Sequence, residues 1–151
     1  MACGTKRLIH TGPFHSGLGY DSDWWNDFRV GDDIPIHPAD DLYALTKYLG
    51  NDITRIFAEE HNLEVLTFLY CHFRTRDILP EERGKGIHPY SSSWEDTGEG
   101  FLYGLRAGAM PSPYETFFMC SRLPHDKYRP DKAKRLLGWE AKDTFEELFR
   151  R

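Results

Sequence analysis

The residues best able to do chemistry are Tyr43 and Lys47, which lie four positions apart in the stretch DDLYALTKYLGNDITRIFAEEH. On a helix, positions i and i+4 share one face, so the lysine ammonium can lie beside the phenol. A tyrosine serves as a general acid or base near neutral pH only if its pKa falls from about 10, which a nearby cation favours. Spacing alone does not separate this interpretation from an ordinary amphipathic surface, because Tyr128 and Lys132 repeat it around Pro130.

Hydrophobic patterns predict the elements that must position the pair. Apolar residues recur every three or four positions over 40–61, which predicts a helix with Asp40 or Asp41 as its N-cap. Short apolar runs predict buried strands at 6–11, 64–71 and 116–120. Further helices are predicted at 94–109, at 131–138, and after a capping-box pattern formed by Thr144 and Glu147. Strands that alternate with helices predict the α/β class with parallel strands.

Composition restricts the function classes. A chain of 151 residues with net charge −5 predicts one domain, 1–151, and no nucleic-acid surface. No apolar stretch reaches the length of a membrane span, so we expect no membrane partner. The three cysteines, Cys3, Cys71 and Cys120, are odd in number and far apart, which favours reduced thiols in a cytoplasmic protein.

Several motifs together resemble one family. YALTKYLGNDITRIFAEEHNLEVLTFLY resembles the active-site helix and following strand of the extended short-chain dehydrogenase/reductases, the NAD-dependent epimerase/dehydratase family. KRLIHT resembles that family's fifth strand, and RPDKAKRLLGWEAKDTFEELF is similar to its C-terminal segment. Asp96 matches an aspartate that heads a late helix in the family. The resemblance covers most of the chain in the family's order and implies the C-terminal part of a Rossmann-like sheet of about three strands.

The resemblance also implies a function and its residues. It implies an oxidoreductase of the epimerase/dehydratase type that uses NAD or NADP on a sugar-nucleotide or related hydroxyl or carbonyl substrate. Tyr43 would be the general acid/base. Lys47 would bind the nicotinamide ribose and lower the tyrosine pKa, so both residues would also contact the cofactor. Arg74 and Arg122 are candidates for binding an anionic substrate, although each is equally well explained as a solvated surface arginine.

The family's catalytic hydroxyl has no direct equivalent. Gly12 and Pro13 occupy the positions of the family's two serines. Thr11 is therefore our candidate for the hydroxyl that binds the reacting oxygen. Other donors lie nearby in the sequence, namely Ser16, His10 and His15.

Other interpretations remain open at this stage. The chain lacks the family's glycine-rich phosphate loop, since Gly17-Leu18-Gly19 has no third glycine, so a non-catalytic family remnant or scaffold is the main alternative. A weaker alternative is a metal-dependent or hydrolytic enzyme built on a loop of histidines and aspartates: His15, Asp21, Asp23, His37, Asp40 and Asp41. No standard ligand spacing supports it, so we predict no metal site. An aromatic cluster could cover a substrate or simply anchor its loop: Trp24, Trp25 and Phe28.

Assembly follows from the same resemblance. In the family, the Tyr-x-x-x-Lys helix packs against its counterpart from a second subunit, so we expect a homodimer or larger homo-oligomer. The strand at 6–11 would pair in the family with a fourth strand that these 151 residues do not include, and an unpaired edge favours association with another chain.

The missing glycine loop predicts a result for the cofactor. We expect the 151-residue chain by itself to bind NAD(H) and NADP(H) weakly or not at all, because no motif in it holds the pyrophosphate. Isothermal titration of each dinucleotide measures this, with ADP-ribose as a control for binding without nicotinamide. A dissociation constant in the micromolar range would contradict the prediction.

Overall fold

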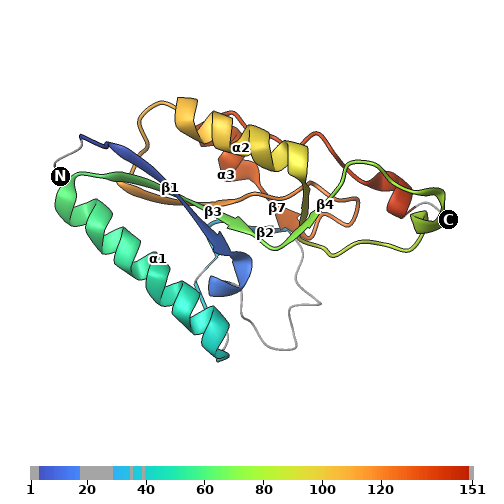
Figure 1. The fold of residues 1–151 in the computed structure, drawn as a ribbon, viewed down its shortest axis with the longest axis horizontal. Helices are drawn as coiled ribbons and strands as arrows, with labels where there is room; N and C mark the ends of the chain where they lie inside the picture. The colour runs from blue at the N-terminus through green and yellow to red at the C-terminus, as the bar shows by residue number, and fades with distance from the viewer. Residues whose placement is uncertain (1–3, 18–28, 35, 39, 150–151) are drawn as a thin grey trace.

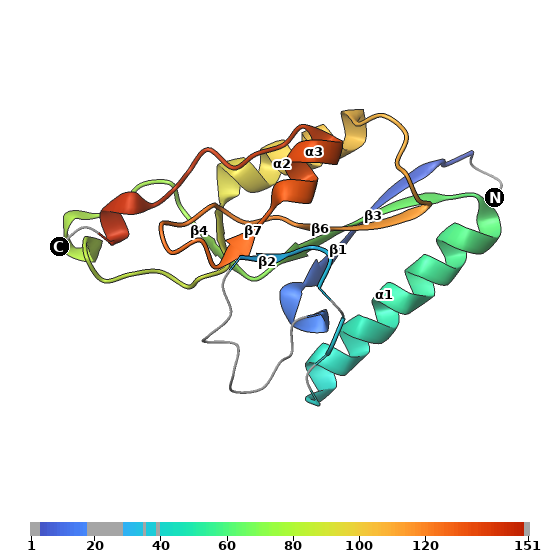
Figure 2. The ribbon, with the colours of Figure 1, turned by 180° about the vertical axis from the view of Figure 1, so that it is seen from behind.

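The molecule has three layers around one small sheet. The computed structural model describes residues 4–17, 29–34, 36–38 and 40–149. Three parallel strands form the sheet in the order β1-β3-β6: β1 (Arg7–Pro13), β3 (Glu64–Tyr70) and β6 (Tyr114–Phe118). Helix α1 (Leu42–His61) covers one face, while α2 (Trp94–Arg106) and α3 (Asp131–Leu137) cover the other (Figures 1 and 2). The predicted α/β class and the three strands are confirmed, with ends shifted by about two residues.

The central strand, β3, forms the core. Every residue of β3 after Glu64 is buried, since α1 packs on one face and α2 and α3 on the other. Leu66 and Phe68 lie in the larger core cluster with Phe117, Met119 and Trp139. This is why the sequence of β3 reads as a continuous apolar run rather than an alternating one.

Helix α1 begins where the sequence predicts. The Asp41 side chain accepts a hydrogen bond from Ala44 N at 2.9 Å, and the helix ends at Asn62, which adopts a left-handed conformation. The only residues that α1 buries are Ala44 and Ala58. Its larger apolar side chains face outward and are 42–76% exposed: Leu42, Leu45, Leu49, Ile53, Ile56 and Phe57. We call these six residues the α1 apolar stripe.

Glycines in α2 serve close packing. A Cβ atom at Gly104 would lie 2.6 Å from Phe68 Cζ, and one at Gly100 would lie 2.6 Å from Met119 Cε. At Gly104 a larger residue would meet the buried Phe68 ring and push α2 away from the sheet, whereas at Gly100 the flexible Met119 side chain can shift. Gly104 therefore allows α2 to approach the core.

The C-terminal segment differs from its prediction. Helix α3 ends at Gly138, whose φ is +75°, as the sequence predicts. The predicted capping box at Thr144 is wrong: the next element is a short 3₁₀ helix, Glu146–Leu148, preceded by Phe145 in a left-handed conformation. Phe145 is buried with Leu123 and Leu148, so tertiary packing of these side chains overrides the local capping signal.

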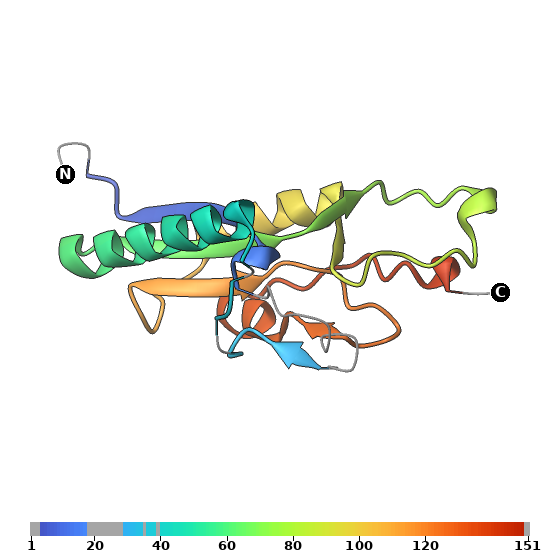
Figure 3. The same cartoon turned by 90° about the horizontal axis from the view of Figure 1, so that it is seen from below.

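Two small strand pairs extend the fold beyond the sheet. Strand β4 (His72–Arg74) pairs with β5 (Ser91–Ser93), and β2 (Val30–Gly31) pairs with β7 (Tyr128–Arg129). Figure 3 shows the loop segments of residues 75–90 and 139–149 extending together past the carboxyl ends of β1 and β3, away from the N-terminus. Within the part of the chain that the structure describes, no helix is long and apolar enough to cross a membrane.

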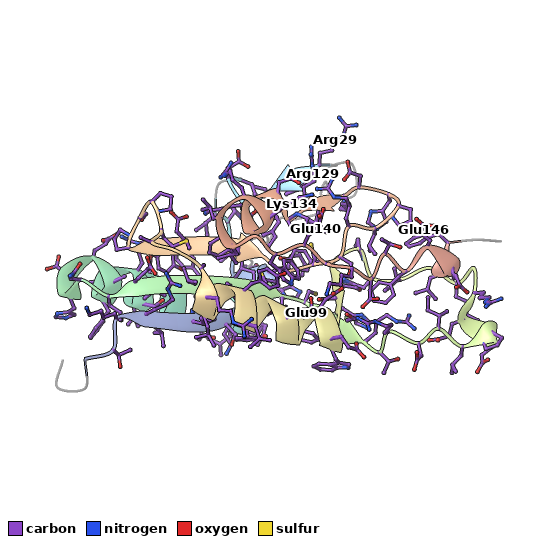
Figure 4. The ribbon with its side chains drawn as sticks, turned by 90° about the horizontal axis from the view of Figure 1, so that it is seen from above. Arg29, Glu99, Arg129, Lys134, Glu140 and Glu146 are labelled. Atoms are coloured by element: carbon purple, nitrogen blue, oxygen red, sulfur yellow. The ribbon has the colours of Figure 1, made fainter. Side chains whose placement is uncertain are left out.

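Ion pairs lie on the outer surface formed by α2 and α3. Figure 4 shows Lys134 and Glu140 beside each other on the α3 side, where they form an ion pair with an N–O distance of 2.7 Å. Lys142 pairs with Glu99 of α2 at 2.6 Å. Helix α1 also carries ion pairs, of Arg55 with Asp52 and Glu59, but it differs in bearing the α1 apolar stripe.

A buried aspartate anchors the C-terminal segment to α2. The Asp96 carboxylate accepts hydrogen bonds from the backbone N–H groups of Lys142 and Asp143 at 3.0–3.1 Å. Trp139 Nε1 donates to the Asp96 carbonyl at 3.1 Å. Asp96 is fully buried at the third position of α2, where the helix dipole also favours its negative charge.

This anchor predicts a stability effect. Asp96→Ala would leave two backbone N–H groups without their acceptor, which costs about 2–4 kcal/mol of unfolding free energy. Urea denaturation followed by circular dichroism measures the loss. The matched control is Glu95→Ala, at the exposed neighbouring position of the same helix turn, which should change stability little. Equal effects of the two substitutions would contradict the proposed anchor.

Candidate active site

Tyr43 and Lys47 lie together on the first two turns of α1. The Lys47 Nζ atom lies 5.7 Å from the centroid of the Tyr43 ring, and Tyr43 is 54% exposed. Because α1 runs back along the sheet, its first turns lie near the carboxyl end of β1 (Figure 1). In open α/β sheets this is the edge at which ligands bind. The helix therefore presents a phenol and an ammonium to solvent at the edge of the sheet where a ligand is expected.

A turn after β1 brings a histidine to this pair. The 3₁₀ helix Phe14–Ser16 buries Phe14 and leaves His15 exposed, with its ring centroid 6.3 Å from that of Tyr43 at an interplanar angle of 72°. Burial lowers the pKa of His15, and the nearby Asp41 carboxylate partly opposes that shift. His15 is therefore a neutral or weakly charged group that faces the tyrosine near pH 7.

Ser16 and Asn51 fasten this turn to α1. Ser16 Oγ donates to the Pro13 carbonyl at 2.8 Å and accepts from Asn51 Nδ2 at 2.9 Å. Ser16 is fully buried, and its hydroxyl hydrogen is used within the turn. We therefore assign Ser16 a structural role, that of holding His15 beside Tyr43.

Thr11 does not join the site. A Cβ atom at Gly12 would lie 3.4 Å from Asn51 Oδ1 of α1, whereas Ile9 Cδ1 lies against Gly104 of α2. Side chains alternate along a strand, so Thr11 points to the α2 side of the sheet, opposite Tyr43 and Lys47. The candidate hydroxyl from the sequence is therefore on the wrong face.

His10 lies on the same face as Lys47. Burial lowers the pKa of His10, and the Lys47 charge lowers it further. Its Nδ1 atom is buried and has no hydrogen-bond partner within the described residues. His10 thus has one buried polar atom without a partner among the described residues, on the side of the sheet where the Lys47 charge acts on it.

A small pocket opens beside the site. It has a volume of about 210 Å³ and lies between Ser16 and Asn51 on one side and the edge of β6 on the other. Asp32 lines it, and burial raises the pKa of that carboxyl to about 6, although the Phe118 N–H donates to it and Lys132 lies nearby. Its volume is small for a cofactor or nucleotide site, and neither Tyr43 nor Lys47 lines it.

The two candidate arginines have different surroundings. Arg74 donates to both Glu82 carboxylate oxygens at 3.2–3.3 Å, stacks on Phe145, and has only 14% of its side chain exposed. Arg122 pairs with Asp131 and Asp126, is 40% exposed, and borders an open pocket of about 570 Å³. Arg122 is thus the more accessible of the two.

The structure also groups residues that the sequence did not. His72 and His88 stack with ring centroids 5.9 Å apart, and Cys71 lies against His88. The two histidines are sixteen positions apart, so no spacing motif reveals them; the available signal is that His72 begins a short strand and His88 precedes one. In the described ranges, no three His, Cys, Asp or Glu residues are arranged to hold a metal ion.

Some sequence predictions fall outside the described residues. These are Cys3, Leu18, Gly19, the candidate metal ligands Asp21 and Asp23, and the aromatic cluster Trp24, Trp25 and Phe28. Cys71 and Cys120 are both free thiols, as the sequence predicts.

The comparisons with known proteins agree on the fold. No family model and no curated protein sequence matches the chain. Among solved structures, a uronate dehydrogenase mutant from Agrobacterium tumefaciens complexed with NAD aligns over 93% of this chain and 48% of its own, with 19% identity and a TM-score of 0.67. Glucuronic acid dehydrogenase from Chromohalobacter salexigens aligns over 95% of this chain and 49% of its own, with 20% identity and a TM-score of 0.68.

The structure of a UDP-glucose epimerase aligns with this chain to a similar extent. UDP-glucose 4-epimerase from Thermotoga maritima, solved with UDP-glucose, aligns over 97% of this chain and 62% of its own, with 18% identity and a TM-score of 0.68. The chain spans about half the length of the two dehydrogenases. The resemblance from the sequence is therefore confirmed for the fold alone: the chain has an α/β fold similar to part of these dehydrogenases, of this epimerase and of a short-chain dehydrogenase/reductase superfamily protein from Agrobacterium tumefaciens.

Proposed function

We propose that this chain carries the Tyr–Lys catalytic region of an NAD(P)-dependent oxidoreductase that acts on a sugar-nucleotide or related sugar substrate. The observation that carries the proposal is the exposed Tyr43 ring with the Lys47 ammonium 5.7 Å from its centroid. This pair lies at the ligand-binding edge of a fold that dehydrogenases of uronates and an epimerase of UDP-glucose also adopt. The alternative, a non-catalytic remnant, predicts no turnover, and the assays below distinguish it from the proposed oxidoreductase.

Tyr43 and Lys47 have different roles in the proposed reaction. Tyr43 would take the proton from the substrate hydroxyl and return it when a carbonyl is reduced. Lys47 would donate hydrogen bonds to the nicotinamide ribose of a bound dinucleotide. When bound, the dinucleotide supplies the hydride acceptor for the substrate carbon. The described residues fit only this end of the cofactor, because none of them forms a glycine-rich phosphate loop.

We assign the second hydrogen bond to the reacting oxygen to His15. The family's serine positions hold Gly12 and Pro13, the Ser16 hydroxyl is used in its turn, and His15 is the polar side chain that faces the Tyr43 ring. An imidazole N–H can donate to the substrate oxygen while Tyr43 accepts its proton. In this proposal the His15 imidazole N–H makes the hydrogen bond that a serine hydroxyl makes in the family.

Arg122 remains our candidate for a substrate phosphate. Its guanidinium is partly exposed beside an open pocket and could exchange Asp126 for a phosphate oxygen. Arg74 would first have to release Glu82, so we rank it second.

The proposal predicts the effect of removing either catalytic group. In an assay of dinucleotide reduction with uronates and UDP-sugars, Tyr43→Phe should lower kcat about 10²-fold or more, because the general acid/base is lost. Lys47→Met should cause a similar loss. The matched control is Tyr48→Phe, on the same helix, which should retain near-normal turnover. Equal small losses of kcat for Tyr43→Phe and Tyr48→Phe would mean that Tyr43 and Lys47 are ordinary surface residues. No turnover by the wild-type protein would favour the alternative of a non-catalytic remnant.

We also propose that two copies of the chain associate through α1. The six residues of the α1 apolar stripe lie at helical spacings of one, three and four, so they form one continuous face. Exposed apolar patches of this kind mark protein interfaces, and a second copy offers an equally apolar and complementary helix. Both outer faces carry ion pairs, such as Lys142–Glu99 on one and Arg55–Glu59 on the other, so the choice of α1 rests on its apolar stripe.

Sedimentation equilibrium at micromolar concentrations tests this association. We expect a mass at least twice 17.6 kDa, and we expect Ile53→Glu to shift it toward 17.6 kDa by placing a charge in the interface. Leu105→Glu, at a 64% exposed position on α2, is the matched control and should leave the mass unchanged. A wild-type chain that sediments as a monomer would remove the proposed interface.

A further inference from the structure

The pocket beside the candidate active site contains a carboxylate that the proposed reaction does not use. Asp32 lines this pocket, whose volume is about 210 Å³. Apolar side chains form much of the remaining wall: Ile34, Ile36, Leu69 and Phe118. A cavity of about 150 Å³ is large enough for benzene, so this one has room for a small organic molecule but not for a nucleotide. We call it the Asp32 pocket.

Backbone hydrogen bonds hold the Asp32 carboxylate at the free edge of β6. Because β6 is an edge strand that pairs only with β3 in the sheet, alternate N–H groups of β6 point away from β3. The N–H of Phe118 donates to Asp32 Oδ1, and the backbone N–H of Lys132, in the first turn of α3, also donates to this carboxylate. An ionised carboxylate offers about four lone-pair positions, so Asp32 can accept a further hydrogen bond from a ligand.

The cation that lines the pocket is paired with a different acid. Lys132 is the only cation among the described residues of the pocket wall, and its Nζ atom lies 2.7 Å from Glu115 Oε2. That pair is neutral as a unit, so Asp32 supplies the net charge of the lining side chains. Burial raises the pKa of Asp32 to about 6, although the Phe118 N–H and the Lys132 charge both lower it. The protein thus compensates the Asp32 charge only in part.

The remaining neighbours of Asp32 supply no positive charge. Burial raises the pKa of Tyr90 and of Cys120, and the Asp32 charge raises both further, so these two groups stay neutral near pH 7. On the opposite side of the pocket, Asn51 Nδ2 donates to Ser16, and Asn51 Oδ1 is buried without a partner among the described residues. Asp32 and Asn51 therefore add hydrogen-bond acceptors, and no second cation, to an otherwise apolar wall.

We propose that the Asp32 pocket binds a primary ammonium group carried on a short aliphatic chain. The ammonium would donate to the Asp32 carboxylate and balance its charge, while the chain packs against the apolar wall. A hydroxyl in the same place would leave the charge unbalanced, and a carboxylate would be repelled by it. The site is independent of the proposed reaction, because neither Tyr43 nor Lys47 lines the pocket.

Binding of an ammonium depends on pH through Asp32. An ammonium favours the ionised carboxylate, so it binds more tightly as the pH rises through about 6 and lowers the pKa of Asp32 in turn. Between pH 5 and pH 7 the affinity should rise about tenfold, because the ionised fraction of Asp32 rises by about that factor. An alkylammonium itself stays protonated over this range.

The test uses the Phe118 amide, which reports the protonation of Asp32 because it donates to that carboxylate. Nitrogen–proton NMR spectra of the wild-type protein are recorded from pH 5 to 8 in potassium chloride. The series is repeated at equal ionic strength with n-butylammonium chloride, sodium butyrate or butan-1-ol. We expect n-butylammonium to lower the titration midpoint seen at Phe118 by about 0.5 unit or more, and butyrate and butan-1-ol to leave it in place.

Two variants assign the response to one carboxylate. Asp32→Asn should abolish both the titration at Phe118 and its response to n-butylammonium, whereas Asp33→Asn, at the exposed neighbouring position, should leave both intact. A midpoint that n-butylammonium does not lower, or that butan-1-ol lowers equally, would overturn the ammonium site. A response that persists in a folded Asp32→Asn protein would also overturn it. The midpoint is measured in the wild-type protein, so it decides the proposal even if Asp32→Asn does not fold.

Discussion

The parallel pairing of β1 with β3 is the interaction on which the site depends. Its register sets Arg7 opposite Glu64 at one end and Pro13 opposite Tyr70 at the other. At the first end, Arg7 pairs with Glu64 and donates to the carbonyls of Ala107 and Gly108 at 2.6 Å, just beyond α2. One guanidinium thus joins two strands and a helix. The opposite end of the pair carries the turn with His15 and lies near the start of α1.

The second constraint is the attachment of that turn to α1. Ser16 and Asn51 join the segment after β1 to the third turn of the helix, so Tyr43 and His15 keep a fixed relation although both are exposed. Pro13 contributes through its carbonyl, which accepts from Ser16 at 2.8 Å and so holds the turn that carries His15.

Sequence patterns predicted the helices and strands more accurately than they predicted which side chains lie next to one another. The α1 period, its Asp41 cap and the apolar runs were enough to predict the helix and the three strands, because these signals are local. The sequence KRLIHT did not predict on which face of the sheet Thr11 lies, because that run has no clear alternation of apolar and polar residues. The approach of His88 to His72 depends on β4 pairing with β5, which no local pattern encodes. Phe145 shows the same limit, because burial with Leu148 decided its conformation.

The central claim is that Tyr43 and Lys47 serve hydride transfer on a sugar substrate. The most direct measurement uses uronates and UDP-sugars that carry deuterium on their carbinol carbons, incubated with the protein and with NAD or NADP at a concentration high enough to offset the weak dinucleotide binding expected of the 151-residue chain. Mass spectrometry then reads whether deuterium appears on the reduced dinucleotide. The account predicts that the label moves to the nicotinamide with the wild-type protein and that this transfer is lost in Tyr43→Phe. Label that remains on the sugar in every case, or that transfers equally well in Tyr43→Phe, would contradict it.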